Sequence, residues 1–161
     1  SKHPLKKAYR KFDKAKENLA LAAEQDPTNE ILWFSLGSVL DNLGNAEEAI
    51  AAYLKALEVK SDYFDANYNL GALYFNQAVQ GINEANDMWK PRMTKTESDA
   101  QKTLEEDAKA LFGTAKPFLE TAHASDSMDS QTMRSLKDIY ARTGEDEKWT
   151  EMSAKLKAVG Q

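Results

Sequence analysis

The stretch that decides the fold is residues 33–61, WFSLGSVLDNLGNAEEAIAAYLKALEVKS, in which two apolar stripes at helical spacing are separated by Gly44. The second half of this pattern recurs 34 residues upstream, and the first half recurs 34 residues downstream. A further copy follows near the C-terminus. The recurring positions are Ala15, Leu19, Ala22 and Pro27; Asn67, Leu70, Gly71 and Tyr74; Ala115, Leu119, Ala122 and Ser127; and Met133, Leu136, Lys137, Tyr140 and Gly144. A unit that recurs at this period predicts an array of stacked helix pairs.

The pattern resembles the tetratricopeptide repeat (TPR), in which an aromatic residue, Leu-Gly and Tyr lie on a first helix and small residues lie on a second. Small residues such as Gly37 and Ala49 allow two helices to approach closely, and large ones such as Trp33 and Tyr53 fill the remaining space. The resemblance covers nearly the whole chain. It implies an all-α fold, a right-handed superhelical stack of antiparallel helix pairs with about seven helices.

We expect a single domain over residues 1–161, with helix boundaries uncertain by about 2–4 residues. The expected helices are 4–25, 29–43, 46–59, 62–90, 95–125, 130–143 and 145–158. The expected units are the second helix of a truncated repeat (4–25), a repeat (29–60), a repeat with elongated helices (62–126) and a C-terminal capping repeat (129–158). Pro27, Ser61 and Ser127 mark where the next helices start, and Gly44 and Gly144 mark helix ends.

The middle repeat is longer than the first, because Ala115 lies 41 positions after Tyr74, whereas Ala49 lies nine positions after Leu40. The additional residues continue two apolar stripes, the first of which reaches Trp89. We therefore expect both helices to be longer by about 16 residues each, forming a projecting antiparallel hairpin. Pro91 would end its first helix, and a Thr94-x2-Glu97 capping box would start its second. The two stripes consist of Leu70, Tyr74, Ala78, Ile82, Ala85 and Trp89, and of Leu104, Ala108, Leu111, Ala115 and Leu119.

Both ends of the array depart from the pattern. In the last repeat Lys137 replaces the usual Gly and Trp149 replaces a small residue, which suits a capping unit whose inner stripe is Trp149, Met152, Leu156 and Val159. Residues 4–25 carry a stripe that needs a second partner. We expect further repeats before Ser1, and the alternative is a homodimer through residues 4–25.

Composition excludes several classes of protein. The 161 residues are 42% hydrophobic and contain no cysteine, which excludes disulfides, thiol nucleophiles and thiolate metal sites. No apolar run is long enough for membrane insertion. Residues 1–16 hold seven basic side chains and one acid, which we interpret as a solvated helix face rather than a nucleic-acid site. The compartment is open. The absence of an initiator Met and a surface rich in Asn, Asp, Ser and Thr favour export to a bacterial periplasm over the cytoplasm.

No motif for chemistry is present. The two histidines, His3 and His123, belong to no metal-ligand motif, and we expect His123 to face a helix C-terminus or solvent. Asp126 and Asp129 lack the glycine and glutamate of a calcium loop and are expected to cap the following helix. We predict no catalytic residues, no cofactor and no metal, and therefore no enzyme.

The resemblance implies a concave face lined by the first helix of each unit. Its aromatic side chains offer rigid contact area, and asparagine offers both a donor and an acceptor to an extended peptide. The candidate groove residues are Phe34, Ser38, Asp41, Asn42, Tyr68, Asn69, Ala72, Phe75, Asn76, Arg134, Asp138 and Arg142. The clamp with which some family members hold chaperone tails is not predicted, because Asn69 alone matches among Phe34, Ser38, Asn69, Gln131 and Ser135.

The sequence thus favours a non-enzymatic scaffold that binds a protein or peptide segment on its concave face or its projecting hairpin. Two alternatives stay open: a structural module that associates with itself, and a regulatory segment of a larger multidomain protein. The identity of the partner does not follow from the sequence, because the same fold serves many functions.

Overall fold

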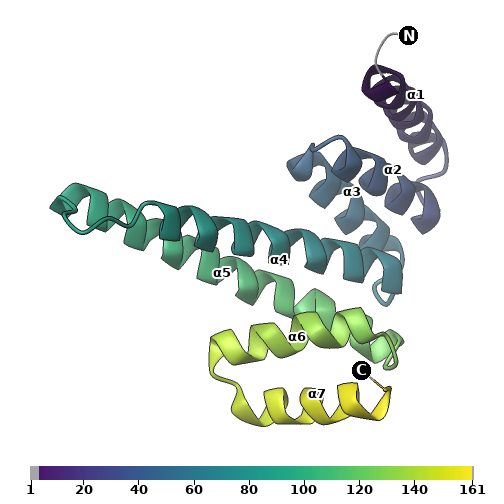
Figure 1. Ribbon diagram of the computed structural model, residues 1–161. Helices are drawn as coiled ribbons and strands as arrows, with labels where there is room; N and C mark the ends of the chain where they lie inside the picture. The colour runs from purple at the N-terminus through teal and green to yellow at the C-terminus, as the bar shows by residue number, and fades with distance from the viewer. Residues whose placement is uncertain (1–3, 161) are drawn as a thin grey trace. The chain divides into compact units, whose positions relative to one another are not determined.

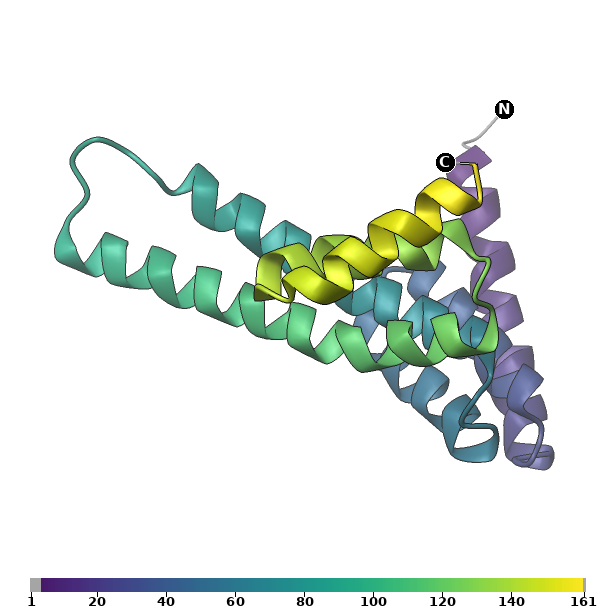
Figure 2. The same ribbon diagram turned by 90° about the horizontal axis from the view of Figure 1, so that it is seen from below.

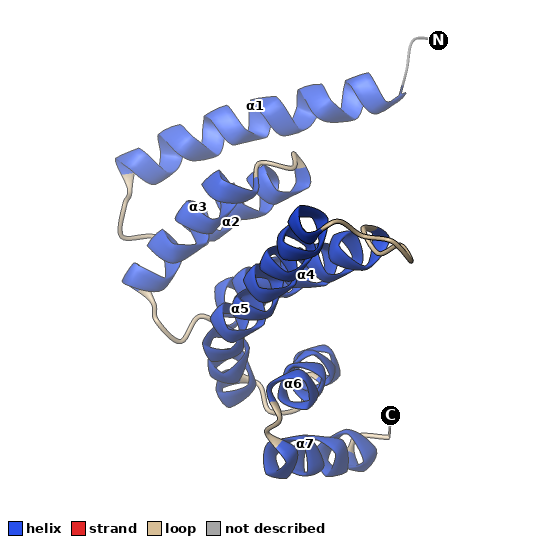
Figure 3. Ribbon diagram, turned by 90° about the vertical axis from the view of Figure 1, so that its left-hand side faces the viewer, coloured by secondary structure: helices blue, strands red, loops and turns tan. Residues whose placement is uncertain are grey.

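The computed structural model describes residues 4–160, with side chains from residue 7 onward, and this part of the chain forms seven helices and no strand (Figures 1 and 3). Lys2 and His3 lie outside the described residues. The all-α, TPR-like fold predicted from the sequence is confirmed, and every helix boundary lies within three residues of the prediction. The helices are α1 (Pro4–Gln25), α2 (Glu30–Asn42), α3 (Ala46–Val59), α4 (Phe64–Asp87), α5 (Lys95–Ser125), α6 (Ser130–Thr143) and α7 (Asp146–Ala158).

The chain divides into two compact units, Ser1–Leu70 and Gly71–Gln161, with the division inside α4. Each unit has its own apolar core. In the first unit the core includes Leu36, Leu40, Tyr53, Ala56 and Leu70, and in the second it includes Phe112, Leu119, Met133, Leu136 and Ile139.

The first unit is built on the close approach of α2 to α3. Gly37 lies directly over the ring of Tyr53, where a Cβ would stand 2.6 Å from Cδ1. Since Tyr53 is fully buried, the ring has no room to withdraw. The predicted role of Gly37 as a small residue at a helix–helix contact is confirmed. Gly44 follows the end of α2 with a φ of +79°, a left-handed conformation that glycine adopts without strain, and the chain then turns into α3.

The helix starts lie slightly beyond the predicted signals. Asn29 rather than Pro27 caps α2, because its Oδ1 accepts a hydrogen bond from the backbone N–H of Ile31 at 3.1 Å. Asp129 rather than Ser127 caps α6, and its Oδ2 accepts from the backbone N–H of Thr132 at 2.7 Å. Carboxylate and amide oxygens are the acceptors that helix N-termini need. The expected capping role of Asp129 is thus confirmed.

The second unit begins with the predicted hairpin. Figure 2 shows α5 running back along α4 from a loop at the far end. Contacts fix the antiparallel register: a Cβ on Gly71 would meet Leu119 Cγ at 2.6 Å, and the Gln101 amide donates to the carbonyl of Ala85 at 2.9 Å. The helices contain 24 and 31 residues, against 13 and 14 in α2 and α3. The added length therefore falls more on α5 than on α4.

The loop of the hairpin begins earlier than the sequence predicts. The sequence predicts that Trp89 continues the apolar stripe, but α4 ends at Asp87 and Trp89 is 66% exposed. The capping box is present as predicted: Glu97 N–H donates to Thr94 Oγ1 at 3.2 Å, and Thr94 N–H donates to Glu97 Oε2 at 2.9 Å. Lys90 Nζ lies 2.6 Å from the Glu97 carboxylate. The hydrogen bond from Lys90, followed by the one from the Thr94 backbone, lowers the pKa of Glu97 to about 2.

A charged network joins α5, α6 and α7. Glu145 Oε1 accepts from Lys116 Nζ at 2.8 Å, and Lys148 Nζ lies 2.9 Å from Glu145 and 3.2 Å from Glu120. The hydrogen bond from Lys116 is the largest of the contacts that lower the pKa of Glu145 to about 2. The Tyr140 hydroxyl donates to Glu120 at 2.9 Å, and burial followed by this contact raises the pKa of Tyr140. The network holds the last helix pair against the hairpin.

Candidate functional site

The candidate groove residues of the first unit converge on the hydroxyl end of Tyr53. The Asn69 amide donates to the Tyr53 hydroxyl at 3.3 Å, and Ser38 is near enough to this hydroxyl to act on its pKa. The Phe34 ring packs beside Tyr53 with a centroid distance of 5.9 Å, and edge-on against Tyr63 at 5.5 Å. Side chains of α2 and α4 therefore present aromatic and amide groups together.

Two further members of the set, Asp41 and Tyr68, differ in exposure. Asp41 on α2 is exposed, and partial desolvation of its carboxylate by neighbouring atoms raises its pKa. The ring of Tyr68 stacks on Phe64 at 5.9 Å with nearly parallel planes. Asn42 is exposed, and its amide donates to the backbone carbonyl of Ser38 at 2.7 Å. We call Phe34, Ser38, Asp41, Tyr68 and Asn69 the aromatic–amide surface.

The candidate residues of the second unit form a different arrangement. Phe75 on α4 packs edge-on against Phe112 of α5 at 5.4 Å. The Arg142 guanidinium lies 4.8 Å from the centre of the same Phe112 ring and donates to Asp138 at 3.0 Å. These partners are intramolecular, so Phe75, Asp138 and Arg142 form a packed cation–aromatic cluster. Ala72, half-buried, and Asn76, exposed, lie beside Phe75 on α4.

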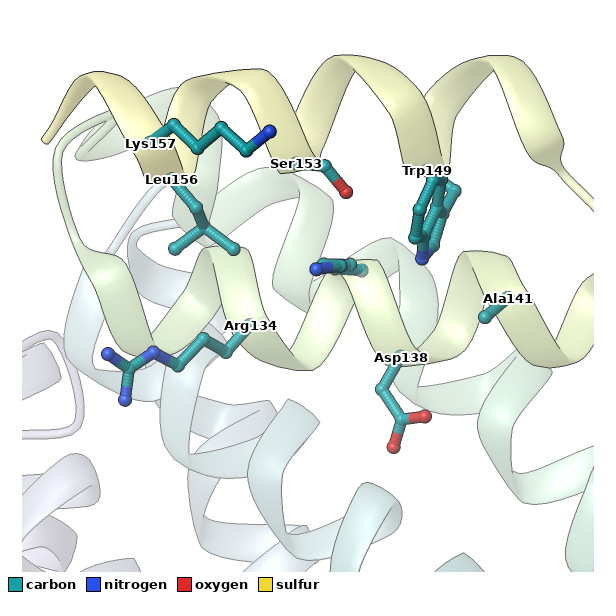
Figure 4. A pocket seen from close by; sticks show the side chains of 8 residues that line it. Arg134, Asp138, Ala141, Trp149, Ser153, Leu156 and Lys157 are labelled. Carbon is teal, nitrogen blue, oxygen red and sulfur yellow. The ribbon is translucent and has the colours of Figure 1, made fainter. Parts of the chain in front are cut away.

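A pocket of about 460 Å³ lies between α6 and α7 and takes in two of the predicted residues, Arg134 and Asp138. Figure 4 shows Arg134, Leu156 and Lys157 at one end of it and Ala141 and Trp149 at the other. The remaining lining residues are Lys137 and Ser153. Trp149, expected in the inner stripe, is 39% exposed and lines this pocket, whereas Met152 and Leu156 are buried as predicted.

Sequence reasoning missed this pocket, although a signal for it is present. Lys137 and Trp149 depart from the repeat pattern, and the sequence alone suggests only a capping role for them. Ser153 occupies the position that Tyr53 holds in the first repeat, which is a third departure. Lys137 on α6 faces Trp149 and Ser153 on α7. That these three substitutions in the repeat pattern meet is apparent only once the two helices are placed against each other.

His123 is half-buried near the end of α5 rather than exposed. Its Nε2 lies 3.4 Å from Lys155 Nζ, and its buried Nδ1 has no hydrogen-bond partner within the described part of the chain. Burial, followed by the charge of Lys155, lowers the pKa of His123. In residues 7–160 no group of three or more acidic, histidine or cysteine side chains could hold a metal ion together. Along the same described helices, none combines the length and apolarity that crossing a bilayer requires.

Comparison with known proteins places the chain among repeat proteins. Residues 42–77, which include α3 and the first half of α4, match the family described as TPR repeat. The peroxisomal targeting signal receptor of Candida albicans is 41% identical over 69 residues, 43% of this chain and 12% of the receptor. The receptor of the same name from Saccharomyces cerevisiae is 38% identical over 65 residues, 40% of this chain and 11% of that one. The chain thus spans about an eighth of the length of these curated relatives.

A solved structure supports the same fold over most of the chain. A thermophilic TPR protein of Thermus thermophilus superposes with a TM-score of 0.59 at 16% sequence identity. The superposition covers 95% of this chain and 68% of the other.

Proposed function

Because the chain is a tetratricopeptide-repeat protein, we propose that it is a non-enzymatic scaffold that binds a segment of a partner protein on the aromatic–amide surface. The TPR fold serves as a protein-interaction scaffold. Its helix pairs expose side chains from successive first helices on one extended face. The name of the partly similar receptors indicates that those proteins recognise a targeting signal, which supports a peptide as the ligand class here.

The observation that carries the proposal is the composition of this surface. Phe34 and Tyr68 are half-buried, so each ring is in contact with a neighbouring ring and still has part of its surface in solvent. Rigid rings lose little conformational entropy when a ligand packs on them. Asn69, positioned by Tyr53, and the exposed Asp41 add hydrogen-bonding groups that suit the backbone and side chains of an extended peptide.

A peptide-display selection against the whole chain tests this function. Peptides that are enriched on the wild type are titrated against Tyr68→Ala and Asp41→Ala, with Glu58→Ala as the matched control, an exposed acidic residue of α3 in the same unit. We expect affinity to fall at least tenfold for the first two variants and to stay unchanged for the control. Absence of any enriched peptide, or equal affinity for all variants, would refute the proposal.

A second candidate, self-association through α1, is favoured by the exposure of the first half of that helix. Every residue from 7 to 14 is exposed, including Tyr9 at 57% and Phe12 at 36%. Exposed aromatic side chains of this kind are typical of contact surfaces. Light scattering gives the molar mass of the wild type and of a Tyr9→Ser, Phe12→Ser double variant. This candidate requires that the wild type is a dimer and that the double variant is a monomer.

A further inference from the structure

The pocket between α6 and α7 exists because the third helix pair reverses the sizes of two facing residues. In the first pair, Gly37 on α2 lies against the ring of Tyr53, 16 residues later on α3. The same spacing on α6 and α7 joins Lys137 to Ser153. The large residue thus moves to the first helix and the small one to the second. A serine cannot fill the volume of a tyrosine ring, so space remains between the helices.

The exchanged residues give that space its chemical character. Ser153 extends its hydroxyl toward α6 (Figure 4), where Oγ is buried and has no hydrogen-bond partner within the described part of the chain. Trp149 stands where the first repeat has Ala49, and its ring forms one wall of the pocket. Lys137 Nζ lies 5.2 Å from the centre of that ring, which keeps its ammonium group at the pocket.

The charge of the pocket is opposite to that of the chain. Arg134, Lys137 and Lys157 line it, whereas its one carboxylate, Asp138, accepts a hydrogen bond from Arg142 at 3.0 Å. The whole chain carries a net charge of −5. A cationic recess on an acidic protein attracts anionic groups of a partner and disfavours cationic ones.

The shape of the pocket fits a helix. Its lining residues recur at helical spacing on both sides, at 134, 137, 138 and 141 on α6 and at 149, 153, 156 and 157 on α7. A groove between two helices accepts a third helix whose side chains pack into it. The first pair provides an internal precedent, because Tyr53, the counterpart of Ser153, is contacted by Asn69 from the helix that follows. The groove runs over about two turns of α7, or about 10 Å.

We infer that the α6–α7 pocket binds an acidic amphipathic helix of a partner protein. Carboxylates of this helix pair with Arg134, Lys137 and Lys157, and an apolar side chain packs against Trp149 and Leu156. The inference rests on the proposed function only in taking a protein segment as the ligand. It assigns a second surface, separate from the aromatic–amide surface, and the chemical class of its occupant.

The test uses a defined probe, an acetylated and amidated alanine-based helix with two central Leu residues one turn apart and a pair of Glu at each end. A control probe has Gln in place of every Glu. Binding is followed by the indole N–H signal of Trp149 in ¹H–¹⁵N correlation spectra, assigned with Trp149→Phe. The principal variant combines Lys137→Gly with Ser153→Leu, which copies the Gly71–Leu119 pair of the hairpin and fills the pocket. Lys137→Gln, which removes charge while nearly retaining size, provides a second variant independent of repacking.

We expect the acidic probe to shift the Trp149 signal saturably, and the Gln probe to bind at least tenfold more weakly. The filled variant should lose binding while its urea midpoint is unchanged or higher, and Lys137→Gln should weaken binding severalfold. The inference is overturned if the acidic probe gives no saturable shift at millimolar concentration, or if the filled variant binds as the wild type does. Display-selected peptides that still require Tyr68 would then leave the proposed function standing, so the two failures are distinguishable.

Discussion

Replacing Gly37 by alanine measures how closely α2 and α3 must approach. The new methyl group would stand 2.6 and 2.7 Å from two carbons of the Tyr53 ring, where ordinary contact begins at 3.4 Å. The fully buried ring would have to move by nearly an ångström to relieve this overlap. Overpacking of this kind costs about 1–3 kcal/mol. Alanine is favoured over glycine in a helix by roughly 0.5–1 kcal/mol, so the free energy of unfolding should fall by about 1–2 kcal/mol.

Gly113→Ala is the matched control. Gly113 also lies inside a helix, α5, but a Cβ there would meet nothing within 4 Å. Only the gain in helix propensity remains, so stability should rise by roughly 0.5–1 kcal/mol. Urea unfolding followed by circular dichroism at the helical band measures both. The variants should therefore shift the midpoint in opposite directions, and a Gly37→Ala protein as stable as Gly113→Ala would refute the contact as a constraint on the fold.

Three further predictions concern the second unit. Gly71→Leu should lower the free energy of unfolding by about 1–3 kcal/mol or more, because its Cβ alone would come within 2.6 Å of Leu119 Cγ; urea unfolding checks this, and a neutral result would contradict the hairpin register. Thr94→Ala should cost about 1 kcal/mol by removing the N-cap of α5, and hydrogen exchange should increase in the first turn of that helix if the cap is what holds it. Burial, followed by the charge of Lys155, lowers the pKa of His123, so the folded state favours the neutral imidazole. The contribution of His123 to the free energy of unfolding is therefore present above the pKa of the unfolded state and is lost as the pH falls. Melting temperature should accordingly drop more for the wild type than for His123→Gln between about pH 7.5 and about pH 5, and parallel curves would exclude the effect.

The helix pairs could be predicted because their determinants are local. The 3–4 spacing of apolar residues, the glycines at close contacts and the Thr94 capping box are properties of short segments, and each is present in the structure. Trp89 shows where this reasoning ends. It continues the apolar stripe of α4 in spacing, but the helix stops before it and its ring stays largely exposed.

The candidate site was less predictable, because its character depends on which neighbours each side chain meets. The positions of Asn42 and Arg142 in the repeat predict that both face a ligand. The structure adds that the Asn42 amide donates to the backbone of its own helix and that Arg142 contacts Asp138 and Phe112, while the predicted role of both residues in a groove stays a prediction. Spacing assigns a residue to a face of a helix, but a hydrogen bond or ring contact depends on distances between side chains.

By itself, the sequence determined that this protein is an all-helical repeat array, which residues face the helix–helix contacts, and where two helices lengthen into a hairpin. Periodicity suffices for this because a helix has a constant pitch. Only the tertiary structure decided that Lys137, Trp149 and Ser153 surround one open pocket, and which polar groups of the candidate surface already have partners. A pocket is the volume that packed side chains leave unfilled, and that volume depends on two helices being placed against each other.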